Sequence, residues 1–192
     1  MRISATLTAG HTRLVPLNPG FLPQLHQLEL SPELSFRWRH HGAHPNPSDF
    51  EAGLWQCLCN FVVLSDERPV GIVSAYDQDF LGHHCKVAAA KFGVDSGGLS
   101  VITGVFLLID YLLQGWPFQK LYFESPEYNA KQFRSACGTI LHEEGRLKNH
   151  VFLDGEYADL LVLALYRSEW STYSEKWFAS RQRVSSVQFK HA

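Results

Sequence analysis

The chain has 192 residues, of which 45% are hydrophobic and 19% are charged, and its formal net charge is -2. This length suits one domain with a sizeable core, and the composition is that of an ordinary globular protein. The slight negative charge argues against a nucleic-acid polymer as a partner, because binding to such a polymer relies on a basic face that displaces counterions from the phosphates.

Cysteine usage and apolar runs indicate the compartment. Four cysteines are too few for a secreted scaffold held together by disulfides, and no apolar run follows a basic start at the N-terminus. The apolar stretch 101–113 is far shorter than the roughly 20 residues that a membrane span needs. We therefore expect a single domain over residues 1–192 that is reduced, cytoplasmic and without a membrane partner.

Hydrophobic periodicity predicts short, alternating elements in the first half of the chain. In chain order these are a strand over 12–17, a helix over 19–30, a helix from Ser48, a hairpin of 61–64 and 70–76, and a strand over 84–94. A loop rich in His, Arg and Pro separates the two helices.

The second half begins with Gly97-Gly98 and an almost wholly apolar stretch, which is typical of a helix buried on more than one side. The further predicted elements are a strand over 120–125, an amphipathic helix over 129–140, strands over 146–153 and 157–166 that meet at an Asp154-Gly155 turn, and a helix over 168–181. The sum is an α/β fold, in which a mixed sheet of six or seven strands carries helices on both faces.

Several short motifs follow one another in a set order in this half. Asn129 opens a helix, Glu144-Gly145-Arg146 begins a strand, and an apolar strand ends just before Glu169-Trp170. This order resembles that of GNAT superfamily N-acyltransferases, and within them the ribosomal-protein-alanine N-acetyltransferases. The resemblance covers residues 14–170, although Ile140-Leu141 replaces the usual Gly-Phe pair. It implies the GNAT fold, with a mostly antiparallel twisted sheet over about 12–170, and acyl transfer to an amine.

The family binds the coenzyme A pyrophosphate with a glycine-containing turn at the start of its central helix, where backbone N–H groups face the anion. Here Ser96 stands at the basic position of that turn, and Leu99 and Val101 stand where the backbone should approach closely. The resemblance implies the following donor-binding residues: Ala90, Lys91, Phe92, Gly97, Gly98, Leu99, Ser100 and Asn129.

The altered turn leaves three interpretations of the donor site. The turn could still hold the pyrophosphate of an acyl-CoA less tightly, or the site could be a non-catalytic binding site. In the interpretation that we favour here, the donor is a phosphopantetheine thioester on an acyl carrier protein, which has no nucleotide to be held. The acceptor would be the amine of a small biosynthetic molecule.

Acyl transfer needs a neutral amine, a stabilised oxyanion and a thiolate that can leave. The resemblance implies a splay between the central strands, with an oxyanion donor among the N–H groups of residues 90–92. The candidate bases are Glu124, His83, His84, Asp77 and Asp79, and the candidate acids near the family's position at Ala136 are Cys137, Ser135 and Tyr128. From these we select Glu124, His84, Asp79 and Cys137 as catalytic candidates.

A basic and aromatic cluster in the loop after the first helix is the candidate acceptor site, because Arg matches carboxylates or phosphates and Trp offers a stacking face. Its residues, together with one tyrosine at a strand end, are Arg37, Trp38, Arg39, His40 and Tyr76. They suggest an anionic or nucleotide-like acceptor. The alternative is a solvated loop whose arginines pair with Glu29, Glu33 or Asp49.

No metal site is expected, because the spacings of His83, His84 and the cysteines match no standard zinc pattern. A homodimer is compatible with the sequence.

Overall fold

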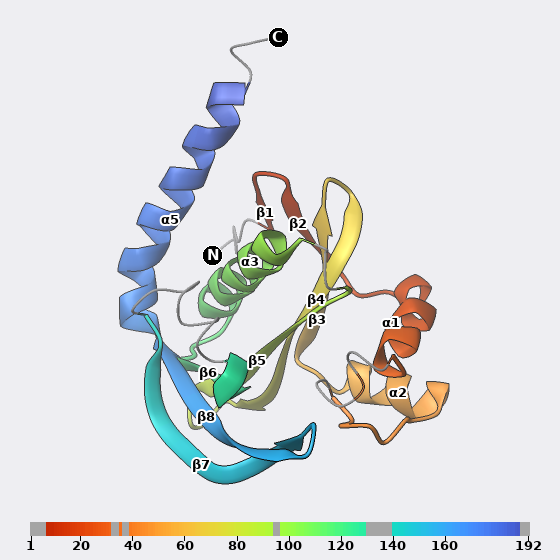
Figure 1. The fold of residues 1–192 in the computed structure, drawn as a ribbon. Helices are drawn as coiled ribbons and strands as arrows, with labels where there is room; N and C mark the ends of the chain where they lie inside the picture. The colour runs from red at the N-terminus through yellow and green to blue at the C-terminus, as the bar shows by residue number, and fades with distance from the viewer. Residues whose placement is uncertain (1–6, 32–34, 36–38, 94–96, 130–139, 189–192) are drawn as a thin grey trace.

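The computed structural model describes residues 7–31, 35, 39–93, 97–129 and 140–188. It contains one eight-stranded sheet with helices on both faces (Figure 1). The strands are β1 (Thr8–Ala9), β2 (Thr12–Pro16), β3 (Cys59–Ser65), β4 (Arg68–Asp79), β5 (His84–Lys91), β6 (Lys120–Pro126), β7 (His142–Leu153) and β8 (Glu156–Tyr166). The helices are η1 (Pro19–Phe21), α1 (Leu22–Glu29), α2 (Pro47–Trp55), α3 (Gly98–Gly115) and α5 (Arg167–Gln188).

The strand order is β1-β2-β3-β4-β5-β6-β8-β7, and among these neighbours β5 and β6 are paired in parallel while the others are antiparallel. The predicted mixed, mostly antiparallel sheet is therefore confirmed. The count of six or seven strands is too low, because β1 is a two-residue strand that is too short to show any periodicity.

Two apolar clusters pack on opposite faces of the sheet. On the α3 face, α3 packs against side chains such as Cys85, Val87 and Leu121. On the α1/α2 face, residues of α1 and α2 pack against Val62 and Ile72. By length and composition alone, helix α3 could span a membrane, but most of its side chains are buried inside the protein. Its continuous apolar sequence is thus that of a core helix.

Helix α5 begins one residue earlier than predicted and extends to Gln188. Its first turns lie over α3, where Trp170, Tyr173 and Trp177 surround the ring of Phe106 at centroid distances of 5.5, 6.0 and 4.8 Å. The later turns extend away from the sheet (Figure 1). Aromatic packing against α3 therefore fixes the direction in which the chain leaves the domain.

Strand β7 curves strongly around β8 (Figure 1). Its pairing with β8 shifts register twice, between Glu143 and Gly145 and between Leu147 and Val151. Extra residues in one strand of a pair bend that strand, which accounts for the curvature. The predicted turn joins the two strands, and Asp154 and Gly155 both have positive φ, at 54° and 85°, as a two-residue hairpin turn requires.

Candidate active site

The parallel strands β5 and β6 separate partway along their length. They pair only at His84–Lys120, Cys85–Leu121 and Lys86–Tyr122, although both strands continue beyond these residues. This separation, called the divergence below, is the splay that the family resemblance implied. It opens toward the C-terminal end of β5, from which the chain continues into α3.

The hydrogen-bond pattern of β5 decides which of its N–H groups face the divergence. The N–H of Phe92 donates to the carbonyl of Val70 on β4, at 3.0 Å. Because such pairs alternate along an antiparallel ladder, the N–H groups of Ala88 and Ala90 also point toward β4. The N–H of Ala89 points toward β6. The expected oxyanion donor at residues 90–92 therefore does not fit Ala90 or Phe92, but the N–H of Lys91 points toward β6 as that of Ala89 does. Of these two, Ala89 lies nearer the last β5–β6 pair and is the candidate donor.

The α1/α2 face of the divergence carries a lysine between two carboxylates. Lys86 Nζ lies 2.9 Å from Glu124 Oε1 and 3.2 Å from Asp77 Oδ2. These contacts, first that with Glu124, raise the pKa of Lys86. Tyr76 pairs with Lys86 across the strands, and burial followed by the charge of Glu124 raises the pKa of its hydroxyl. The structure thus brings the predicted residues Glu124 and Tyr76 together, and adds Lys86.

Of the other three catalytic candidates, two are described by the structure, and both lie away from the divergence. His84 begins β5 at its paired end, with its ring edge-on to Tyr122 at 5.3 Å. Asp79 accepts the backbone N–H groups of Gly82 at 2.7 Å and Leu81 at 2.9 Å, which lower its pKa. It therefore stabilises the turn between β4 and β5. Cys137 lies outside the described residues.

The donor-binding candidates gather where β5 leads into α3. Gly97 caps α3 with φ 52°, a left-handed conformation that favours glycine, and a Cβ there would lie 3.0 Å from Val70. Leu99 is 65% exposed and Val101 is buried in the core. Ser100 donates to Ser65 at 2.9 Å.

The remaining donor candidates lie on both sides of the divergence. Lys91 ends β5, while Ala90 and Phe92 pack against the cluster on the α1/α2 face. Asn129 is exposed in the helical turn 127–129 that follows β6, and Ser96 lies outside the described residues.

Two members of the predicted acceptor cluster anchor the loop between α1 and α2. Arg39 donates to the carbonyl of Gly53 at 2.8 Å. His40 contacts Glu29 Oε1 through its backbone N–H at 3.0 Å and its ring Nδ1 at 3.1 Å, and the Glu29 side chain is 1% exposed. In the alternative, the arginines of a solvated loop pair with Glu29, Glu33 or Asp49. Here Glu29 contacts His40 and Arg39 bonds to a backbone carbonyl, so both residues have partners within the protein, although not the arginine–carboxylate pairs of that alternative. Arg37 and Trp38 lie outside the described residues.

Sequence reasoning missed a polar network around Glu144 at the paired end of β6. Glu144 accepts from Lys120 at 2.8 Å, from Tyr122 at 2.7 Å and from the hydroxyl of Tyr166. These bonds, first that from Lys120, lower the pKa of Glu144 to about 2. The sequence gives no signal for this network, because the first register shift of β7 places Glu144 there.

Acid is expected to destabilise the protein through this carboxylate. Its pKa is about 2 in the folded chain against an ordinary value of 4.5, so its bonds stabilise the fold fully above about pH 4.5 and lose that effect as the pH falls toward 2. We expect the Tm measured by calorimetry to fall across this window, and to fall less in Glu144→Gln, which should have a lower Tm at pH 7. Glu156→Gln at the exposed hairpin is the control, and equal pH slopes for all three proteins would contradict the assignment.

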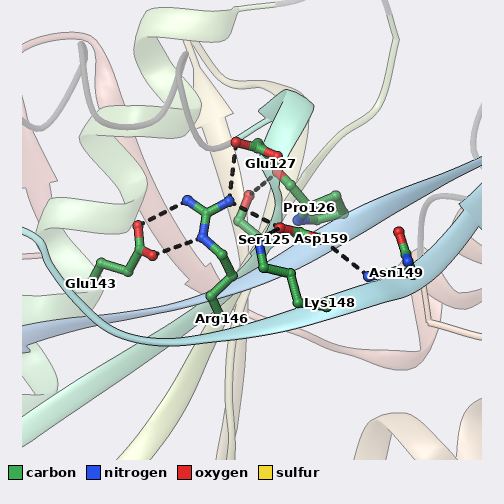
Figure 2. A network of polar contacts seen from close by, with 8 residues as sticks. All are labelled: Ser125, Pro126, Glu127, Glu143, Arg146, Lys148, Asn149 and Asp159. Atoms are coloured by element: carbon green, nitrogen blue, oxygen red, sulfur yellow. Dashed lines mark hydrogen bonds and ion pairs between the residues drawn. The ribbon is translucent and has the colours of Figure 1, made fainter.

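Arg146 joins three elements beside the divergence on the α3 face (Figure 2). Its guanidinium lies 3.1 Å from Glu127, 3.0 Å from Glu143 and 3.1 Å from Asp159. Asp159 also accepts the backbone N–H of Asn149 at 3.0 Å, at the second register shift of β7. The end of β6, which no longer pairs with β5, is therefore held to β7 and β8 by ion pairs.

A surface hollow of about 410 Å³ lies where β3 begins, and none of its lining residues comes from β5 or β6. Within the described part of the chain, no group of three or more His, Cys, Asp or Glu side chains is placed to hold a metal ion. The divergence is the candidate reaction site, because Lys86, Glu124 and Asp77 meet where β5 and β6 separate.

Solved structures share this fold. A spermidine N-acetyltransferase from Vibrio cholerae in complex with CoA and spermine superposes with a TM-score of 0.71 at 18% identity, covering 83% of this chain and 98% of that one. The RimL ribosomal L7/L12 alpha-N-protein acetyltransferase in complex with coenzyme A gives 0.70 at 13%, covering 84% and 97%. The chain has the GNAT fold. No protein-family model and no curated protein matches the chain, and at these identities the likeness establishes the GNAT architecture alone.

Proposed function

We propose that this GNAT-fold chain is an N-acyltransferase that moves an acyl group from acyl-coenzyme A to the primary amine of a small molecule. The divergence carries the proposal, because Glu124 lies on its β6 side and the N–H of Ala89 is directed into it from β5. A carboxylate beside an N–H donor supplies the two groups that attack of an amine on a thioester uses.

The reaction follows from these two groups. Glu124, directly or through a water, takes a proton from the acceptor amine, whose nitrogen then attacks the thioester carbonyl and forms the C–N bond. The N–H of Ala89 donates to the oxyanion of the tetrahedral intermediate. The C–S bond breaks as the carbonyl reforms, and the thiolate of coenzyme A leaves and takes up the second proton that the attacking nitrogen loses as it becomes the neutral amide nitrogen.

The start of α3 supports acyl-CoA as the donor. The N–H groups of Gly98, Leu99 and Ser100 begin an 18-residue helix, and a helix N-terminus favours an anion such as the pyrophosphate. A Cβ on Gly98 would meet nothing within 4 Å, so the approach is open. The comparisons give no support to the carrier-protein donor expected from the sequence, since two of the similar structures are complexes with coenzyme A.

Calorimetric titration tests this donor. We expect acetyl-CoA and coenzyme A to bind, and acetyl-pantetheine, which lacks the nucleotide, to bind more weakly by at least about tenfold, equivalent to roughly 1.4 kcal/mol. Equal binding of all three would contradict a role for the α3 N-terminus. No binding of coenzyme A, together with transfer from an acyl carrier protein, would restore the tethered donor.

We also propose that the protein works in the reducing cytosol. Cys57, Cys59 and Cys85 are free thiols, and burial raises the pKa of Cys59 and of Cys85 to about 12. Thiols held neutral in this way are poor nucleophiles, which agrees with a packing role for both.

A further inference from the structure

Lys86 is shared between two carboxylates at the point where β5 and β6 separate. Its side chain is 29% exposed, Glu124 is 31% exposed and Asp77 is 61% exposed. Glu124 is the proposed base, and its carboxylate has an ammonium partner, Lys86, at 2.9 Å. An acceptor amine that approaches Glu124 as an ammonium ion meets the like charge of Lys86.

A bulge in β4 gives Lys86 its second partner. The β4–β5 register is regular up to Tyr76–Lys86 and then shifts before Asp79–His84. Asp77 lies in this shift with φ 47°, a left-handed conformation that Asp tolerates better than most residues. In a regular strand Asp77 would point to the face opposite Tyr76. The bulge instead brings its carboxylate within 3.2 Å of Lys86, and bulges beside active sites commonly redirect a side chain in this way.

We propose that Lys86 is a positioning residue that moves between two carboxylates. It lies between Glu124 and Asp77 before an acceptor binds, and it shifts onto Asp77 when the acceptor amine takes its place at Glu124. The inference rests on the proposed function, in which Glu124 receives the proton of the amine. The residues that follow Lys86 on this face of β5 are Ala88 and Ala90, whose side chains are small.

Asp77 therefore acts on the acceptor only through Lys86, and a double-mutant cycle tests this. The probes are butylamine, 1,4-diaminobutane and 4-aminobutanoate with acetyl-CoA, and the acceptor KM is measured for whichever is acetylated. Asp77→Asn should raise that KM about tenfold, a coupling within the usual range for ion-pair networks. Lys86→Met should lower it, and Asp77→Asn should have no effect in the Lys86→Met background. The KM for acetyl-CoA should stay unchanged throughout.

Asp66→Asn is the matched control. Asp66 also has φ 47° and an ionic partner, His11 at 3.0 Å, but it lies in the β3–β4 turn. It should leave the acceptor KM unchanged. If Asp77→Asn raises the acceptor KM equally with and without Lys86, Asp77 contacts the acceptor itself and the proposal is wrong. The same holds if neither single variant changes the KM.

A second measurement does not depend on turnover. The ammonium of Lys86 is titrated by NMR in the parent protein, in Glu124→Gln and in Asp77→Asn. If both carboxylates hold the Lys86 ammonium, each variant should lower the pKa of Lys86 partway toward its ordinary value. If the pKa of Lys86 changes in only one of the two variants, Lys86 is not shared between the two carboxylates and the proposal is wrong. If no amine is acetylated while both variants lower the pKa, the acyltransferase proposal fails and the shared lysine stands.

Discussion

Replacing Glu124 by Gln is expected to lower kcat/KM for acyl transfer by at least about 100-fold, because a positioned general base contributes roughly 10² to 10⁴ in rate. Gln has the same shape and keeps a carbonyl oxygen near Lys86, but it cannot take the proton of the amine. Binding of acetyl-CoA should be unchanged, since Glu124 lies on the α1/α2 face and α3 begins on the other. Single-turnover transfer and calorimetric binding measure the two quantities separately.

Glu127→Gln is the matched control for that variant. Glu127 follows β6 closely and also pairs with a cation, Arg146 at 3.1 Å, but it does so on the α3 face. We expect kcat/KM to change less than about threefold, as for the loss of one ion pair near the surface. If Glu124→Gln and Glu127→Gln have equal activity, Glu124 is not the base, and the amine must lose its proton by another route.

Replacing Arg167 by Met is expected to destabilise the fold by about 3 kcal/mol, because it removes charge-assisted hydrogen bonds and leaves carbonyl groups without donors. The Arg167 guanidinium donates to the carbonyls of Leu113 at 2.6 Å, Trp116 at 2.5 Å and Phe118 at 2.6 Å. These carbonyls belong to the last turn of α3 and to the segment that joins α3 to β6. The expected loss corresponds to a fall in Tm of roughly 10 °C, which calorimetry at pH 7 measures.

Two further variants show whether a loss of stability in Arg167→Met comes from its hydrogen bonds. Arg68→Met removes an exposed arginine at the start of β4 and should change stability by less than about 0.5 kcal/mol, as surface substitutions usually do. Arg167→Lys keeps the charge but cannot reach three carbonyls, so it should fall between the parent and Arg167→Met. If Arg167→Met is as stable as Arg68→Met, the contacts at the end of α3 contribute nothing net.

Local patterns were sufficient where one segment forms one element. The nearly continuous apolar run of α3, the Asp154-Gly155 turn and the order of strands in the second half are all present as the sequence indicated. Such features depend on periodicity and on the φ preferences of single residues, and both are properties of the local chain. The family resemblance added the divergence of β5 and β6, which periodicity does not predict.

The site itself depends on contacts between distant segments. Whether Arg39 and His40 face a ligand or hold a loop depended on the buried Glu29 and on the end of α2, which only folding brings near them. The direction of the Ala89 N–H depends on the β4–β5 register, because a shift of one residue exchanges the groups that face each neighbour.

The sequence by itself determined the α/β class, the buried central helix, the principal turns and the candidacy of Glu124. Only the tertiary structure decided which charges meet at the divergence. Lys86 reaches Glu124 because two strands far apart in the chain pair up to that residue and no further, and it reaches Asp77 because a bulge turns that aspartate back. Ion pairs at fixed distances require a defined register between strands, and register follows from the packing of the whole sheet.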